Sequence, residues 1–178
     1  MISYSTISDL PKEKMLEFLA IYAKDWLATD GLWFQSVESK YGMDEAMEHD
    51  VNVWQKLGVI EARRIKEFLD LPERPGISGL KQSLAFRLYS PINSDRIEIS
   101  ENQLTYYTEV CRVQSARSRK NMPLHPCKIV GITEFTAFAQ TIDDRFTVEC
   151  VSCYPDLIDT QNACVWRFTL AENDPDRS

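Results

Sequence analysis

Residues 97–111, with the sequence IEISENQLTYYTEVC, carry the pattern that decides the fold. Apolar and polar residues alternate over 97–100, and Glu101-Asn102 has the composition of a turn. The segment that begins at Leu104 alternates again, which places one set of side chains on each face of an extended chain. Two alternating runs around a short turn predict a β-hairpin, and therefore an antiparallel sheet in the second half of the chain.

The residues before this hairpin have a helical pattern. Ser8 or Asp9, followed by Pro11, has the composition of a helix start. One apolar stripe follows at helical spacing: Met15, Phe18, Leu19, Tyr22 and Trp26. Asp30-Gly31 is expected to interrupt this helix.

Three further helices are expected before the hairpin. A short one over 32–41 is expected to stop at Gly42, and a long one is predicted over 44–71, ended by Pro72 and Pro75. Residues 79–89 suggest another helix, which Pro91 closes.

The residues after the hairpin predict two helices and two more strands. A polar helix is expected over 112–121, a proline-containing loop over 122–127, and an amphipathic helix that reaches Ile142. Alternation around 146–150 and 164–170 predicts the last two strands, and the polar tail 172–178 is expected to fray. The prediction is thus an α+β protein in which N-terminal helices pack on a C-terminal antiparallel sheet of β-β-α-α-β-β order.

The chain length fits one domain. The 178 residues match the size of a single domain over 1–178, with a helical part over 8–90 and an α+β part over 91–172. The net charge is −7, so nucleic acid and anionic membrane surfaces are not expected as partners. The first residues have no basic segment followed by an apolar one, so a cytoplasmic location is expected. The sequence does not specify an oligomeric state.

Five cysteines, all after residue 110, are the sharpest chemical feature. An odd number of cysteines in a chain without a secretory signal does not predict a disulfide framework. Cys150-x-x-Cys153 has a spacing common in zinc and iron–sulfur sites, and Cys150 and Cys164 are predicted on the same side of the last two strands. We therefore expect a thiolate metal site, zinc or an iron–sulfur cluster, from Cys127, Cys150, Cys153 and Cys164.

Two other interpretations of the cysteines remain open. The cysteines on strands are also compatible with small core residues, and Cys111 or His125 could replace a metal ligand. His125 lies two residues before Cys127, which suggests instead a catalytic pair with Cys127 as nucleophile and His125 as its base. Serine-nucleophile, Walker and dinucleotide-binding motifs are absent, as are the two Glu-x-x-His motifs of di-iron bundles.

Aromatic and basic residues suggest a ligand pocket. Trp33, Trp54 and Arg112 are the residues expected to bind a small and possibly anionic molecule between the helices and the sheet. Asp50 and Glu61 share a face of the long predicted helix and suggest a polar rim for this pocket. A solvated helix face is the competing interpretation of both the acidic and the basic groups.

Three segments carry a resemblance to known families: DGLWFQSVESKYGMDEAMEHDVNVW (30–54), CRVQSARSRKNMPLHPC (111–127) and VECVSCYPD with ACVWRF (148–156 and 163–168). They resemble a family of small uncharacterised cytosolic proteins from anaerobic bacteria. Cys150, Cys153, Cys164 and the aromatic last strand are also similar to 4-vinyl reductase-like ligand-binding domains and to aminothiazoline-carboxylate hydrolases. This resemblance implies an α+β ligand-binding fold and no particular reaction.

Two functions are therefore expected. The first is a small-molecule-binding protein with a cysteine-thiolate metal site. The alternative is a metal-free cysteine hydrolase that acts on a C–N bond of a small cyclic or amide substrate. A sensor or scaffold without chemistry is a third class.

Overall fold

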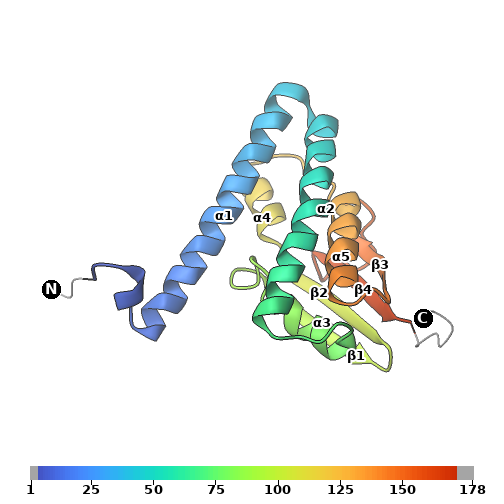
Figure 1. Cartoon of the computed structure of the whole chain (residues 1–178). Coiled ribbons are helices and arrows are strands. Elements are labelled where there is room, and N and C mark those ends of the chain that lie inside the picture. The colour runs from blue at the N-terminus through green and yellow to red at the C-terminus, as the bar shows by residue number, and fades with distance from the viewer. Residues whose placement is uncertain (1–3, 172–178) are drawn as a thin grey trace.

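The computed structural model describes residues 4–171 and has the predicted α+β architecture, with helices in the first half and strands in the second (Figure 1). A short 3-10 helix, Ile7–Asp9, precedes α1. The elements are α1 (Lys12–Tyr41), α2 (Met43–Phe68), α3 (Gly76–Leu84), β1 (Ser94–Ser100), β2 (Gln103–Val110), α4 (Arg112–Arg119), α5 (Lys128–Ile142), β3 (Phe146–Cys153) and β4 (Cys164–Leu170). The predicted order β-β-α-α-β-β is confirmed, and the tail expected to fray lies outside the described residues.

The four strands form one antiparallel sheet in the order β1-β2-β4-β3, so the two hairpins meet at β2 and β4. Helices α2 and α5 pack on each other and cover the sheet (Figure 1). Large side chains fill the space between these layers, and Phe135 of α5 lies 5.0 Å from Trp166 of β4 between ring centroids. Gly131 permits this packing, because a Cβ atom there would lie 2.4 Å from the ring of Trp166.

The predicted helix break at Asp30-Gly31 is wrong. Helix α1 runs through both residues to Tyr41, because a glycine inside a helix costs only about 1 kcal/mol relative to alanine. The chain reverses instead at Gly42, whose φ of 94° is a conformation that favours glycine. Helix α3 also begins earlier than predicted, at Gly76, and ends at Leu84.

The predicted apolar stripe of α1 lies largely outside the core. Leu19 and Tyr22 are each 52% exposed, and Ala23 is the one residue of α1 classed as buried. In Figure 1 the first turns of α1 extend away from the body of the molecule. Helical periodicity therefore identified the helix, but it did not identify which stripe would be covered.

A buried charge network joins α2, α5 and the segment after α3. The guanidinium of Arg87 donates to Glu61 of α2 at 2.8 and 3.0 Å and forms an ion pair with Glu134 of α5. Glu61 also accepts a hydrogen bond from the backbone of Leu88, and Glu134 accepts one from the hydroxyl of Tyr89. The fully buried Arg87 side chain contacts both Glu61 and Glu134, and it therefore links α2 to α5.

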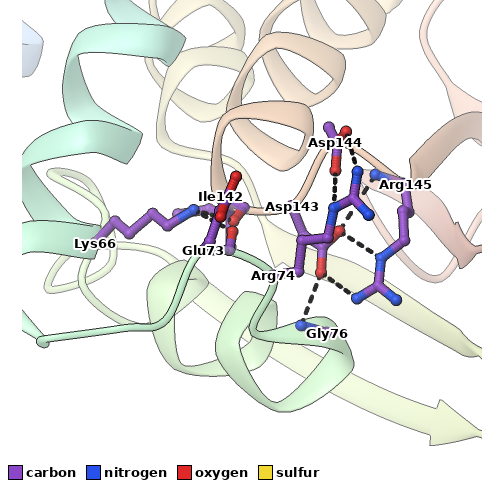
Figure 2. Close-up of polar contacts among 8 residues, drawn as sticks. All are labelled: Lys66, Glu73, Arg74, Gly76, Ile142, Asp143, Asp144 and Arg145. Atoms are coloured by element: carbon purple, nitrogen blue, oxygen red, sulfur yellow. Dashed lines mark hydrogen bonds and ion pairs between the residues drawn. The ribbon is translucent and has the colours of Figure 1, made fainter. Parts of the chain in front are cut away.

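A second polar junction fixes the loop between α2 and α3 against the turn between α5 and β3 (Figure 2). Lys66 donates to the carbonyl oxygens of Glu73 at 2.6 Å and Ile142 at 2.7 Å. Arg74 forms a two-bond pair with Asp144 at 2.9 Å for each bond, but both side chains are exposed. The junction thus has a covered side and a solvated side.

Asp143 is the buried centre of this junction. Replacing it with Asn is expected to lower the free energy of unfolding by about 1–3 kcal/mol, because buried hydrogen bonds to a charged group would be lost. Its carboxylate accepts bonds from the guanidinium of Arg145 at 2.8 and 2.9 Å and from the backbone N–H of Gly76 at 2.9 Å. Burial opposes ionisation, but these bonds outweigh it and hold the pKa of Asp143 below its usual value. Urea unfolding measures the loss, and Asp144→Asn, which changes an exposed neighbour, should leave stability nearly unchanged. Equal losses in the two variants would contradict this assignment.

Candidate functional site

A β-bulge in β3 sets the positions of three cysteines. The register between β3 and β4 shifts between Cys150 and Ser152, so that Cys150 pairs with Trp166 and Cys153 pairs with Cys164. Side chains three residues apart on a regular strand point to opposite faces, but one extra residue restores the same face. The bulge therefore places Cys150, Cys153 and Cys164 on one face of the sheet.

Cys127 completes this sulfur cluster from another element. It is the residue before the first turn of α5, and its Sγ lies 3.5 Å from Sγ of Cys153. Cys153 is buried, and its thiol also interacts with the thiol of Cys164. Cys153 thus contacts both Cys127 and Cys164, two of the other cysteines in the predicted set.

His125 lies between a carboxylate and the Cys127 thiol. Its Nε2 is 3.0 Å from Oδ2 of Asp50, which projects from the middle of α2. Both side chains are buried, and the ring of Phe34 packs 4.7 Å from the imidazole ring between centroids. Nδ1 is also buried, and no residue among 4–171 forms a hydrogen bond of normal geometry with it. The Cys127 thiol interacts with the imidazole ring and favours its charged form. This arrangement is the carboxylate–imidazole–thiol order of a cysteine nucleophile with an oriented base.

Gln114 of α4 holds the loop that carries both groups. Its amide nitrogen donates to the carbonyl of His125 at 2.7 Å and contacts Sγ of Cys127 at 3.4 Å. Its amide oxygen accepts the backbone N–H of His125 at 3.0 Å. Gln114 therefore fixes the loop and places an N–H donor at the sulfur atom.

These contacts favour a thiolate–imidazolium pair. The hydrogen bond with Cys153, opposed by burial and assisted by His125 and Gln114, lowers the pKa of Cys127 to about 5. Burial alone would lower the pKa of His125, but Asp50 and Cys127 together raise it to about 9. The pKa of Cys153 is raised above the usual thiol range by its contacts with the thiols of Cys127 and Cys164. The start of α5 adds a partial positive charge that also stabilises a thiolate.

A second carboxyl group lies near the pair. Burial and the charge of Asp50 raise the pKa of Asp30 to about 6, and His125 acts against this increase. Glu38 lies about two turns further along α1 than Asp30. It forms a two-bond ion pair with buried Arg117 at 2.6 and 2.8 Å. Helix α1 is thus tied to α4 beside the site.

The predicted ligand-binding residues do not meet in one place. Trp33 is 71% exposed on α1, whereas Trp54 is buried and packs edge-on against Trp26 at 5.5 Å. The exposed Arg112 donates to the carbonyl of Ile92 at 2.7 Å, so it is partly engaged within the fold. Cys111, which precedes α4, has a pKa raised to about 11, mainly by burial.

The predicted acidic rim separates into two structural roles. Glu61 pairs with Arg87 in the core, whereas Asp50 pairs with His125 at the site. The sequence predicts Asp50 only as part of a pocket rim and predicts no role for Gln114. The spacing of Asp50 on its helix gave no indication of a partner that lies 75 residues away.

Two observations concern all described residues, 4–171. Among them, no group of three or more His, Cys, Asp or Glu side chains is arranged to hold a metal ion. Within the same range no helix is both long and apolar enough to cross a membrane.

Comparisons with known proteins give a family and no activity. The model of a family of unknown function (DUF6125) matches residues 8–170. A search of curated proteins finds no match.

Proposed function

Since the chain belongs to the DUF6125 family of unknown function, we propose its activity from the site alone: a thiolate-dependent hydrolase that cleaves a C–N bond of a small amide or cyclic substrate. One observation carries the proposal, namely that buried His125 lies between Asp50 and Cys127. Asp50 orients the imidazole, and Cys127 supplies the nucleophile. In this proposal the catalytic residues expected from the sequence, Cys127 and His125, keep their roles and gain Asp50 and Gln114 as positioning residues.

The reaction has two steps. The Cys127 thiolate attacks the electrophilic carbon, a C–S bond forms, and the C–N bond breaks as the His125 imidazolium gives its proton to the leaving nitrogen. Neutral His125 then accepts a proton from water, whose oxygen attacks the thioester or its nitrogen analogue and releases Cys127. The N–H of Gln114 at the sulfur stabilises the thiolate between cycles.

Other features are consistent with a small substrate and a reducing compartment. Cys127 is half-buried, which favours a small molecule over a folded protein as substrate. A free thiolate beside a second thiol requires reducing conditions, so we propose the cytoplasm as its location. The resemblance of Cys150, Cys153 and Cys164 to aminothiazoline-carboxylate hydrolases and to 4-vinyl reductase-like domains agrees with the binding of a small ligand.

The test uses p-nitrophenyl acetate as an activated acyl probe and p-nitroacetanilide as a C–N probe. We expect a burst of p-nitrophenol and one acetyl group on the tryptic peptide 121–128, in which Cys127 is the sole cysteine. Cys127→Ala should remove both the burst and the acetyl group. The matched control is Cys150→Ala, another half-buried cysteine of the same cluster, which should retain them.

Acetylation of lysines in place of Cys127, or an undiminished burst in Cys127→Ala, would contradict the proposal. Slow cleavage of the anilide that also depends on Cys127 would extend it from activated esters to C–N bonds.

A zinc or iron–sulfur site is the second candidate. The observation in its favour is the 3.5 Å between Sγ of Cys127 and Sγ of Cys153, since two thiolates on one tetrahedral zinc ion lie about 3.8 Å apart. Cys164 pairs with Cys153 in the sheet, and Cys150 lies on the same face, which supports a shared site even though residues 4–171 hold no group of three or more such side chains already arranged around a metal ion. Such a metal would occupy the Cys127 thiolate and exclude it as a nucleophile.

Elemental analysis of anaerobically purified protein separates the two functions. A stoichiometric metal content that falls in Cys153→Ser would support the metal site and contradict the hydrolase. Metal-free protein that forms the acetyl intermediate would support the hydrolase and contradict the metal site.

A further inference from the structure

A cavity of about 490 Å³ lies between the end of α3 and the β1–β2 hairpin. Apolar side chains from three segments form most of its wall: Leu84, Pro91 and Ile97. Its polar wall consists of Ser90, Asn93, Asp95 and Tyr106. The volume is within the range of small-molecule sites.

Two polar atoms in this wall are buried without hydrogen-bond partners of normal geometry. They are Oδ1 of Asp95 and the hydroxyl of Tyr106, a residue that is only 2% exposed. A register shift between Ser94 and Asp95 places Asp95 opposite buried Thr108, so the carboxyl group faces the interior. Buried polar atoms are nearly always satisfied, but among the described residues these two groups have only each other and the hydroxyl of Thr108, in a geometry that is not a normal hydrogen bond.

The charges around the cavity favour a cation. Arg87 interacts electrostatically with three carboxyl groups, those of Glu61, Glu134 and Asp95, and it pairs directly with Glu61 and Glu134. One cation faces three acidic groups, so the carboxyl groups are in excess. Burial raises the pKa of Asp95, and the nearby hydroxyls of Tyr106 and Thr108 oppose that increase.

We propose that this cavity binds a small organic cation, with an ammonium or amidinium group on Asp95 and Tyr106 and an apolar body against Leu84, Pro91 and Ile97. A charged N–H donor satisfies both orphaned oxygen atoms at once, which a neutral apolar molecule does not. The apolar wall accounts for an organic body. The proposal is independent of the thiol chemistry, and its failure would leave that chemistry untouched.

Benzylamine and benzyl alcohol, titrated into the intact protein and followed by amide ¹H–¹⁵N NMR, provide the test. The two probes have similar shapes and differ in charge at neutral pH. Benzylamine should shift the amides of Asp95 and Tyr106 saturably and bind about tenfold more tightly than benzyl alcohol. Asp95→Asn should weaken benzylamine about tenfold and leave benzyl alcohol unchanged.

Tyr106→Phe is the second variant, because it keeps the core ring and removes one orphaned hydroxyl. The comparison of benzylamine with benzyl alcohol uses the unaltered protein, so it does not depend on whether either variant folds. Equal affinities for the two probes, benzylamine shifts confined to another region, or no saturable binding would each overturn the proposal. The last result would mean that the cavity holds water only.

Discussion

His125→Gln is expected to slow alkylation of Cys127 by iodoacetamide about tenfold at a pH of about 5.5 and to give an equal or faster rate at a pH of about 9.5. The variant removes the imidazolium that, after the Cys153 hydrogen bond, helps to keep the pKa of Cys127 at about 5. Its thiol should therefore return toward the ordinary value near 8.5.

The reversal follows from two opposing effects. A thiol with a pKa of about 5 is mostly thiolate in mild acid, whereas an ordinary thiol is thiolate to only about 0.1% there. A thiolate of lower pKa is intrinsically less nucleophilic, by about half a logarithmic unit for each unit of pKa. The gain in thiolate dominates at low pH. Above the ordinary thiol pKa both proteins are fully ionised, and only the loss of nucleophilicity remains.

Quantitative mass spectrometry of the tryptic peptide 121–128 measures this rate, because the other four cysteines lie in other peptides. Asp50→Asn is the matched variant, since it keeps the imidazole and removes the carboxylate that raises the pKa of His125. It should give an intermediate rate at low pH. A uniform slowing at all pH values would indicate altered access to Cys127 instead of lost thiolate, and would contradict the assignment.

Arg87→Met is expected to lower the free energy of unfolding by about 3–5 kcal/mol, the largest effect among the side chains described here. Methionine fills much of the volume, but it leaves the buried carboxyl groups of Glu61 and Glu134 without their cation. It also removes the stacking of the guanidinium on Phe138, which lies 4.5 Å from the ring centroid. Chemical unfolding followed by circular dichroism measures the loss.

A double variant gives the control. Adding Glu134→Gln to Arg87→Met removes one uncompensated carboxyl group and should recover part of the lost stability, which is a coupling that independent sites do not show. Losses that simply add would show that Arg87 stabilises the fold by packing alone.

Much of the fold was predictable because its signals are local. Alternation over 97–111 and around Cys164 identified both hairpins, and helical spacing identified α5. The break assigned to Asp30-Gly31 failed because local glycine chemistry is weak compared with the rest of a long helix. The bulge in β3 was not predictable, since one extra residue in a strand depends on its pairing with β4.

The candidate site was predictable only in part, for the same reason. Cys127 and His125 lie two residues apart in the sequence, so their spacing alone predicts that they can pair. Asp50 and Gln114 reach the pair through tertiary packing, and nothing local marks either of them. Trp33 shows the opposite error, because a large aromatic residue suggested a pocket wall and is instead exposed.

The division of the site between the two parts of the chain has an evolutionary consequence. Asp50 comes from the part before residue 91, and His125 and Cys127 come from the part after it. A gene fragment that encodes either part alone would carry an incomplete set of these groups. Inheritance of the carboxylate, the imidazole and the thiol therefore requires both parts to travel as a single unit, and a recombination event near residue 91 would separate them.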